Sequence, residues 1–359
     1  MKLTYPDYYP NFHCLAGACP DTCCKGWQIV LDDESLRCYR SLPGALGDRI
    51  RENLITEDGE TRFALRNGVC ALLREDGLCP IQAQVGLEAL CTSCRTHPRF
   101  IEEYGASQEL SLSVSCPEAA RLLLGRSTPL SFLTESTPEA VTDCNDLDAD
   151  LYFALLRARE TATALLHEAR LCVNDRLVLL LRFSERVQRL LDAGQAARVG
   201  ALCRELSYPA SWLRPLRMGR RLRRRPAPFY PAWALLGQME HLTDEFRRLL
   251  DAGIRKEPET FDPDAFPRAE ENLMIYFLFR YFLKAVNDGQ LLPRVQSCVF
   301  HLLAVRTLYT LGEGRGLDAY IKTVSLYSRE VEHSDENLRL LRQVFARGTL
   351  PRDYLYRVL

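Results

Sequence analysis

The stretch Cys14-Leu-Ala-Gly-Ala-Cys19-Pro-Asp-Thr-Cys23-Cys24-Lys-Gly-Trp27 places four thiols within eleven residues. Gly17 and Pro20 interrupt regular secondary structure there, because glycine is flexible and proline lacks a backbone N–H. Such a chain can fold around one centre, and small residues let backbone N–H groups approach the sulfurs of a metal cluster. The stretch therefore predicts a loop-rich region whose fold depends on bound metal.

More cysteines follow in the same region. They occur in Cys70-Ala-Leu-Leu-Arg-Glu-Asp-Gly-Leu-Cys79-Pro, in Cys91-Thr-Ser-Cys94-Arg-Thr-His97-Pro98-Arg99, and in Cys116-Pro117. The two-residue gap between Cys91 and Cys94 places both sulfurs on one metal or cluster. His13 and His97 adjoin cysteines and are either ligands or supporting polar groups. The predicted metal ligands are Cys14, Cys19, Cys23, Cys24, Cys70, Cys79, Cys91, Cys94 and Cys116.

The distribution of the cysteines separates this set from the others. Of 14 cysteines, ten lie in the first 116 residues. Cys38 falls in a helical segment, 34–41, and fits a core position as well as a ligand. The remaining four are predicted to be packing residues: Cys144, Cys172, Cys203 and Cys298.

We expect neither a secretory signal at the N-terminus nor a membrane-spanning helix. No apolar segment behind basic residues precedes Cys19, so we expect no secretory signal. The richest apolar run, 273–283, is too short to span a bilayer. We therefore expect a cytoplasmic chain without a membrane partner, whose thiols stay reduced.

Two kinds of metal centre compete for these thiols. Zinc favours paired C-x-x-C motifs or regular Cys and His spacing, and one such pair occurs here. The adjacent Cys23 and Cys24 also suit one tetrahedral zinc poorly, because neighbouring side chains are expected to diverge. An iron-sulfur cluster accepts irregular spacing, because its ligands approach separate corners, so one four-iron cluster is the favoured reading. Nine thiols exceed four corners, so either a second metal is bound or several thiols are spare.

The rest of the chain predicts a helical body. The 359 residues are 47% hydrophobic and 26% charged, enough for a substantial core. We expect a mainly α fold in which a Cys-rich, loop-rich metal-binding region, 1–125, packs on an α-helical domain, 148–359, with a linker at 126–147. Asp175 and Ser334 are predicted N-caps. The expected helices are 151–166, 177–191, 233–251, 270–287, 292–311, 317–331 and 335–345.

Several glycine-rich and basic segments are predicted to be loops. Asp58-Gly59 and Asp76-Gly77 suit tight turns, and the segment 312–316 is a turn between helices rather than a nucleotide-binding loop. Seven arginines in 214–228 predict a basic loop. That loop is expected to be solvated, with an acidic protein or RNA as the alternative partners. The prolines and the lack of interleaved aromatics within this run make nucleic acid an unexpected partner, whereas the formal net charge of −1 argues neither for nor against one.

These motifs resemble those of the flagellin lysine-N-methylase family, within a wider group of zinc- or iron-chelating proteins. The resemblance lies in Tyr8-Tyr-Pro-Asn-Phe-His-Cys14, the motif from Cys14 to Trp27, Asp76-Gly-Leu-Cys79, Cys91-x-x-Cys94-Arg-x-x-Pro98-Arg99 and Glu271-Asn-Leu…Tyr276-Phe-Leu-Phe-Arg-Tyr281-Phe-Leu-Lys284. It implies an enzyme with a four-iron (4Fe-4S) cluster that transfers methyl groups from S-adenosylmethionine to lysines of flagellin.

That reaction makes specific demands on a site. The lysine amine must be neutral to attack the sulfonium methyl, so its proton must be removed. Aromatic faces suit the sulfonium, and Tyr276 and Tyr281 are the predicted donor-binding residues, although such a run also suits a core. The residues single out no catalytic group. The alternative function is a non-catalytic iron- or zinc-binding or redox module.

Overall fold

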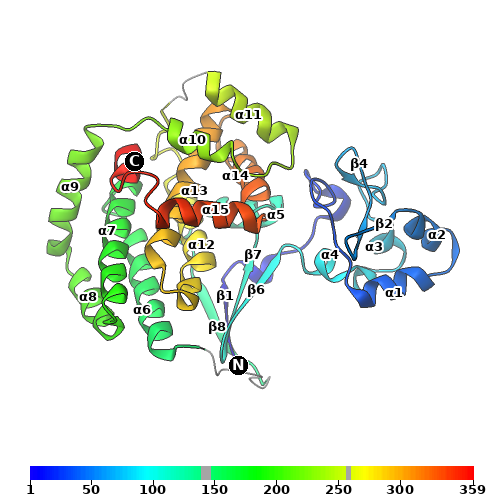
Figure 1. Cartoon of the computed structure of the whole chain (residues 1–359), viewed down its shortest axis with the longest axis horizontal. Coiled ribbons are helices and arrows are strands. Elements are labelled where there is room, and N and C mark those ends of the chain that lie inside the picture. Colours follow the sequence, from blue (N-terminus) through cyan, green and yellow to red (C-terminus); the bar gives the residue numbers. More distant parts are fainter. Residues whose placement is uncertain (139–146, 256–259) are drawn as a thin grey trace.

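The computed structural model of the chain describes residues 1–138, 147–255 and 260–359. Figure 1 shows a large helical body and a smaller lobe, with strands β6 and β7 running beside the junction. Each part has its own buried hydrophobic core. Cys144 and the acidic residues Asp143 and Asp146 of the predicted linker lie outside the described residues.

The small lobe is built from short elements around a small core. The helices are α1 (Asp33–Ser41), α2 (Gly44–Glu52), α3 (Pro80–Gln84) and α4 (Thr92–Thr96), and the strands are β2 (Leu54–Glu57), β3 (Glu60–Phe63), β4 (Leu65–Arg66) and β5 (Val69–Cys70). Asp58 and Gly59 have positive φ angles of 52° and 84°, which confirms the predicted turn of the β2–β3 hairpin. The core consists of Leu31, Tyr39, Ile50, Phe63, Leu72, Ile81, Leu90 and Cys91.

A four-stranded sheet, which the sequence analysis did not predict, adjoins the body. Its strands, in spatial order, are β6 (Arg99–Tyr104), β7 (Ser107–Leu112), β1 (Lys2–Pro6) and β8 (Phe132–Ser136). β1 pairs with β7 in parallel and with β8 antiparallel. β8 falls inside the predicted linker, and its outward side chains are polar or exposed, so nothing in its own sequence marks a strand. Pairing with β1, more than 120 residues away in the chain, makes it one.

The body confirms the predicted mainly α fold. Helices α12 and α13 lie at its centre and are buried around nearly their whole circumference. No helix in the described ranges is long and apolar enough to cross a membrane. The helices of the body are α5 (Pro117–Leu124), α6 (Ala149–Leu166), α7 (Val173–Asp192), α8 (Val199–Leu206), α9 (Leu213–Arg223), α10 (Tyr230–Leu236), α11 (Asp244–Arg255), α12 (Pro267–Tyr281), α13 (Leu291–Leu311), α14 (Leu317–Val331), α15 (Asp335–Ala346) and α16 (Tyr354–Val358). Short 3₁₀ helices cover Tyr9–Asn11, Ala16–Ala18, Leu87–Ala89, Ala196–Arg198, Pro209–Trp212 and Leu283–Asn287.

The predicted helix ends were right in one case and wrong in another. Ser334 caps α15 as expected, because its hydroxyl accepts the Asn337 N–H at 3.2 Å. Asp175 is not an N-cap: α7 begins earlier, after Cys172. The Asp175 carboxylate instead pairs with Arg220 at 2.8 Å and with Arg223, both on α9.

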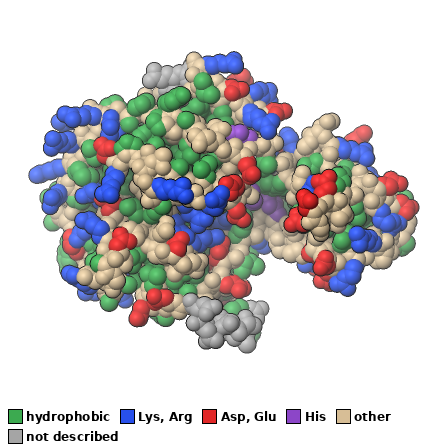
Figure 2. Space-filling view, viewed as in Figure 1, with side chains coloured by type: hydrophobic (Ala, Val, Ile, Leu, Met, Phe, Trp, Pro, Cys, Tyr) green, Lys and Arg blue, Asp and Glu red, His purple; other side chains and the backbone are tan. Residues whose placement is uncertain are grey.

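Two segments differ from the predicted loop and helix. The basic segment 214–228 was predicted to be a loop, but most of it forms α9, which packs on α7 and is held there by Asp175. Figure 2 shows basic side chains gathered on this side of the body. The predicted helix 233–251 is two helices, α10 and α11. The chain between them bends because Leu242 N–H donates to Glu330 at 2.6 Å and Glu240 N–H donates to Asn337 at 2.8 Å.

The described cysteines outside the predicted ligand set have different environments. Cys203 and Cys298 are buried in the large core, as predicted, but Cys172 is exposed at the start of α7 and is not a packing residue. Cys38 is exposed on α1 and fits neither of the roles considered for it.

The close approach of α11 to α10 predicts a stability defect. A methyl group at Gly253 would lie 2.2 Å from Cζ2 of the buried Trp233 ring. We expect Gly253→Ala to lower the free energy of unfolding by about 1–3 kcal/mol through overpacking. Chemical denaturation of the purified variant measures this. Gly237→Ala is the control, because its methyl would meet neighbours no closer than 3.6 Å; equal stability of both variants would contradict the prediction.

Candidate functional site

A cavity of about 680 Å³ lies at the junction of the small lobe and the body. Its walls come from the N-terminal loop, the small lobe, the starts of β6 and α5, and the end of α14. Figure 2 shows histidine side chains in the crease between the two parts. Of the nine predicted ligands, eight line this cavity, and Cys91 is fully buried beside them. The eight are Cys14, Cys19, Cys23, Cys24, Cys70, Cys79, Cys94 and Cys116.

Proline residues set the local geometry of two of these thiols. Cys79 and Cys116 each occupy the N-cap position of a helix whose first residue is proline, a residue that suits this position because it needs no N–H there. Burial raises the pKa of both thiols, and the nearby backbone N–H groups of the following turn oppose the rise. Those N–H groups favour the thiolate form, which is the form that binds metal.

Two pairs of thiols share hydrogen bonds. Cys23 donates to Cys24 and thereby lowers the pKa of Cys24 to about 7 despite its burial. The same bond, together with burial, raises the pKa of Cys23. In the pair Cys91 and Cys94, the pKa of Cys91 is likewise lowered and the pKa of Cys94 is raised. Cys23 and Cys24 both line the cavity.

The thiols are spread over the wall of the cavity and do not converge on one atom position. Within residues 1–138, 147–255 and 260–359, no three or more His, Cys, Asp or Glu side chains are arranged to hold a single metal ion. A tetrahedral zinc would draw four sulfurs to about 2.3 Å from one atom. A thiol set spread over the walls of one cavity fits the donor set of an iron-sulfur cluster, whose irons sit at separate corners.

Aromatic rings form another wall. Trp27 lies 4.6 Å from the His333 ring and 5.5 Å from the His97 ring, measured between centroids, and Phe100 lies 5.6 Å from His333. Burial lowers the pKa of His97 to about 4 and that of His333 to about 3. Both imidazoles are therefore neutral near pH 7. His13 lines the same cavity and is exposed.

His333 and Arg329 reach the cavity from the end of α14. The His333 Nε2 atom lies 2.9 Å from the Ser113 hydroxyl and 2.8 Å from the Ser115 hydroxyl. Arg329 pairs with Asp21 at 2.7 Å and lies over the Trp27 ring at 5.6 Å. Its Nε–H is buried and has no hydrogen-bond partner among the residues that the structure describes. These contacts tie the N-terminal loop to the body.

The predicted donor-binding tyrosines lie behind this wall. Tyr276 and Tyr281 are 2% and 9% exposed, and neither lines the cavity. Their hydroxyls donate to the Glu332 carboxylate at 3.1 and 2.8 Å. Arg280 lies 3.5 Å from the centre of the Phe100 ring, which is on the cavity wall. The tyrosines thus hold Glu332, next to His333; their contact with a methyl donor stays a prediction.

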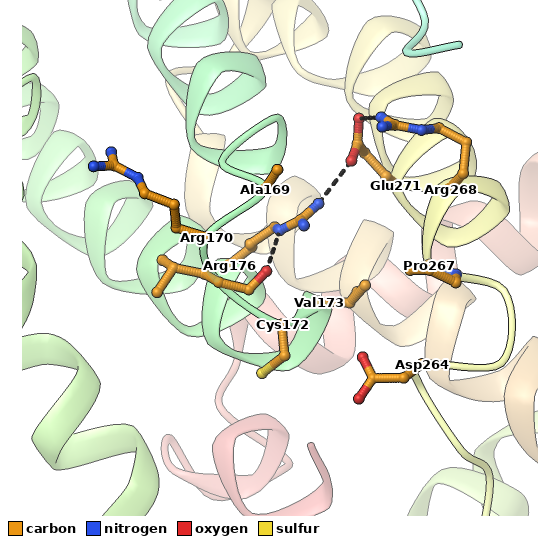
Figure 3. Close-up of a pocket in the computed structure, with 10 residues that line it drawn as sticks. Ala169, Arg170, Cys172, Val173, Arg176, Asp264, Pro267, Arg268 and Glu271 are labelled. Atoms are coloured by element: carbon orange, nitrogen blue, oxygen red, sulfur yellow. Dashed lines mark hydrogen bonds and ion pairs between the residues drawn. The ribbon is translucent and has the colours of Figure 1, made fainter. Parts of the chain in front are cut away.

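A second, more polar pocket of about 400 Å³ lies between the α6–α7 connection and the start of α12 (Figure 3). Its acidic centre is Glu271, which pairs with Arg176 at 2.7 Å and with Arg268. His167 adds a contact at 2.8 Å. Burial would raise the pKa of Glu271, but these partners hold it below its usual value. The charges of Glu271, Arg176 and Arg268 satisfy one another and join α6, α7 and α12 at this pocket.

No pattern in the sequence marks Arg329, His333 or Phe100 as residues of a site. Arg329 lies in a predicted helix and His333 one residue before a predicted cap, positions without a special pattern. Trp27 was quoted with the first cysteine motif but was given no role. The signal that was available is the cluster Arg329-Glu-Val-Glu-His333, which places four ionisable groups at the end of an otherwise buried helix.

Comparison with known proteins matches a C-terminal segment of the chain to a family model. Residues 235–353 match the family described as the FliB lysine N-methylase C-terminal domain. The flagellar biosynthetic protein FliU of Salmonella muenchen is 34% identical over 131 residues, which are 34% of this chain and 78% of that protein. Lysine-N-methylases of Salmonella choleraesuis and Salmonella typhimurium are 33% and 32% identical over 131 residues. The matched stretch covers 33% of each of these two.

No solved structure matches the chain. The match to the family covers α11 to α15, and therefore includes Arg329 and His333 of the cavity wall as well as Glu332 behind it. Because the chain covers 78% of FliU at 34% identity, the similarity is not confined to a short motif. The chain belongs to the FliB family of lysine N-methylases.

Proposed function

We propose that the chain is a protein-lysine N-methyltransferase that uses S-adenosylmethionine, acts on flagellin and carries an iron-sulfur centre. One observation supports this above others: a single cavity is lined both by thiols of the N-terminal part and by Arg329 and His333 of the segment shared with lysine-N-methylases. The flagellar name of a relative supports flagellin as the substrate. We place the reaction in the cytoplasm, where thiols stay reduced.

The reaction needs a neutral amine and a stabilised sulfonium. The lysine nitrogen attacks the methyl carbon, so a C–N bond forms while the C–S bond breaks and the sulfonium becomes a neutral thioether. A proton must leave the nitrogen. His97 and His333 are neutral, so they add no positive charge beside the sulfonium, and their low pKa values make them weak bases for this proton. The faces of Trp27 and Phe100 suit the sulfonium methyl.

Other groups can orient the donor. The buried, unpartnered Nε–H of Arg329 is a donor for the carboxylate of S-adenosylmethionine. The thiols on the cavity wall would hold the iron-sulfur centre. When bound, the centre would supply a Lewis-acidic iron for the amino and carboxylate groups of the donor. The alternative, that the centre is structural, predicts unchanged donor affinity in a folded variant that lacks it.

The mass of flagellin tests the proposal. Flagellin is incubated with anaerobically prepared, iron-loaded protein and with a methyl donor whose methyl group carries a heavy isotope. We expect lysine residues to gain labelled methyl groups, with no gain when the donor or the protein is omitted. Bound iron or zinc without any labelled lysine would favour the non-catalytic metal-binding or redox module.

The indole ring of Trp27 predicts a change in donor affinity. We expect Trp27→Ala to weaken binding of S-adenosylmethionine about 2- to 30-fold, because a cation on an aromatic face contributes about 0.5–2 kcal/mol. Isothermal titration calorimetry measures this. The control is Trp27→Phe, which keeps an aromatic face but loses the indole hydrogen bond to the Cys23 carbonyl at 2.8 Å. Equal weakening by both substitutions would contradict a role for the face.

A further inference from the structure

Strand β6 lies at one edge of the four-stranded sheet and pairs with β7 on its inner side. The N–H of Ser113 donates to the carbonyl of Pro98 at 2.7 Å, which continues this antiparallel ladder by one residue pair. Bonded and non-bonded pairs alternate in such a ladder, so every second residue of β6 points its backbone N–H and C=O groups outward, away from β7. The outward residues are Arg99, Ile101 and Glu103.

The outer edge of β6 is exposed to solvent. Arg99, Ile101 and Glu103 are all exposed, and the apolar Ile101 in the middle of the edge is 56% exposed. Within the described ranges, no backbone group is hydrogen-bonded to the outward N–H and C=O groups of these residues. The register with β7 is continuous, so neither a bulge nor a proline between Arg99 and Tyr104 blocks the edge. Such a row of backbone groups is a template for pairing with another chain.

The same strand begins on the wall of the cavity, which is lined by Pro98, Arg99 and Phe100. Figure 1 shows β6 running from the junction along the body. Side chains alternate between the two faces of a strand, so Phe100 and Glu102 share the face toward the body, where Glu102 pairs with Lys284 at 2.6 Å. A chain paired antiparallel with β6 would run toward the cavity, and its residue opposite Pro98 would carry its side chain on the same face as Phe100.

From this geometry we propose that the outer edge of β6 binds an extended segment of the protein substrate. The segment pairs with β6 as an added antiparallel strand, and its residue opposite Pro98 is the lysine that enters the cavity. In this mode of recognition backbone hydrogen bonds supply affinity, and the alternating side chains supply selectivity. The inference rests on the proposed function, because it gives the protein substrate of that reaction a binding surface next to the cavity.

The side chains along the edge select the chemistry of this segment. Glu103 is exposed, and its carboxylate accepts a hydrogen bond from the neutral Gln108 side chain at 3.1 Å. Residues directly opposite each other on paired strands attract when both are apolar or when their charges are opposite. We therefore expect an apolar residue opposite Ile101 and a cationic residue opposite Glu103. Because the segment runs toward the cavity, both precede the lysine in its sequence.

Hydrogen exchange of the unsubstituted, full-length protein tests the inference. Mass spectrometry follows deuterium uptake with and without soluble flagellin. We expect flagellin to slow exchange in the segment 99–104, which carries the outward amides, and to leave β8 at the opposite edge of the sheet unchanged. Flagellin that gives β6 no protection would overturn the inference. Protection that rises with the concentration of the protein alone would overturn it too, because a second copy would then occupy the edge.

Ile101→Pro tests the backbone pairing, with fluorescence anisotropy of labelled flagellin as the measurement. An edge strand tolerates proline where the lost N–H points outward, so the variant should fold. It should bind flagellin about 3- to 10-fold more weakly and keep its affinity for S-adenosylmethionine. Thr134→Pro is the matched control: Met1 and Thr137 exchange backbone hydrogen bonds, so the N–H of the exposed Thr134 points outward from β8. Equal weakening by both substitutions would contradict the inference.

A second variant keeps the test independent of proline and its effect on folding. Glu103→Lys leaves the backbone of the edge intact and should weaken flagellin binding about 2- to 5-fold, because it opposes the expected cationic residue. Unchanged binding by both variants would overturn the inference. Protection of β6 by flagellin without labelled methyl transfer would leave this inference standing while the proposed function fails. Labelled methyl transfer without protection of β6 would have the opposite meaning.

Discussion

Replacing Arg306 by methionine should lower the free energy of unfolding by about 3–5 kcal/mol, the usual cost of breaking a buried ion pair by removing one partner. Arg306 on α13 donates two hydrogen bonds to the Glu270 carboxylate on α12, at 2.6 and 2.8 Å. The two side chains are 5% and 0% exposed. Without the guanidinium, Glu270 would be a carboxylate buried between the two central helices with no cationic partner.

The pH dependence of this loss has a definite sign. Burial already raises the pKa of Glu270, an effect that Arg306 opposes. In the variant, the folded-state pKa of Glu270 should rise further above its unfolded value. A carboxyl group of this kind is stabilising when protonated at low pH and costs stability as pH rises through its folded pKa. The loss should therefore be larger at pH 8 than at pH 5.

Urea denaturation at both pH values measures this loss, with Arg306→Met combined with Glu270→Leu as the control. The double variant should recover most of the stability, because apolar replacement of a buried pair is often neutral. Additive losses in the double variant would show that the pair is not the source of the effect.

Acidification should destabilise the protein through its buried histidines, and His301 gives the clearest case. This side chain is 1% exposed on α13, its Nδ1 atom lies 2.7 Å from the Tyr327 hydroxyl, and burial lowers its pKa to about 3. The unfolded histidine takes up a proton near pH 6.5, whereas the folded one does not. The stability that neutral His301 gives the folded protein is therefore fully present above pH 6.5 and is lost as pH falls toward 3. The loss between pH 7 and 5 should be about 2 kcal/mol.

The difference between the unsubstituted protein and His301→Gln isolates this effect from that of other groups. Glutamine can still accept a hydrogen bond from Tyr327 but does not titrate. We compare the free energy of unfolding of the unsubstituted protein with that of the variant. Between pH 7 and pH 5, the value for the unsubstituted protein should fall by about 2 kcal/mol more than the value for the variant. Denaturation curves at several pH values give this difference, and parallel pH profiles would refute the prediction.

The position of the cavity connects these stability effects with the proposed chemistry. His301 packs against Phe277 and Tyr281, and Tyr281 holds Glu332 beside His333. The central helices therefore support the cavity wall from behind. A rigid wall of this kind is needed because the donor and the amine must be aligned within a fraction of an ångström. The N-terminal thiols complete the site from the other side.

The sequence by itself determined the thiol set and the helical body. Cysteine type, density and the neighbouring glycines and prolines predict a thiolate centre, and the structure places eight of the nine predicted ligands on one cavity. Apolar periodicity predicts α6, α7, α13, α14 and α15 because each buries a face or its whole circumference. The Ser334 cap and the Asp58-Gly59 turn are also local, since each depends on a few adjacent residues.

The tertiary structure alone decided which distant residues meet. The sheet β6-β7-β1-β8 forms because strands separated by many residues pair through their backbones, and backbone pairing leaves no mark on the side chains of β8. Arg329 and His333 reach the thiols because α14 ends at the junction, which no local pattern records. Local interactions specify elements and residue types, whereas long-range packing specifies which of them share a site.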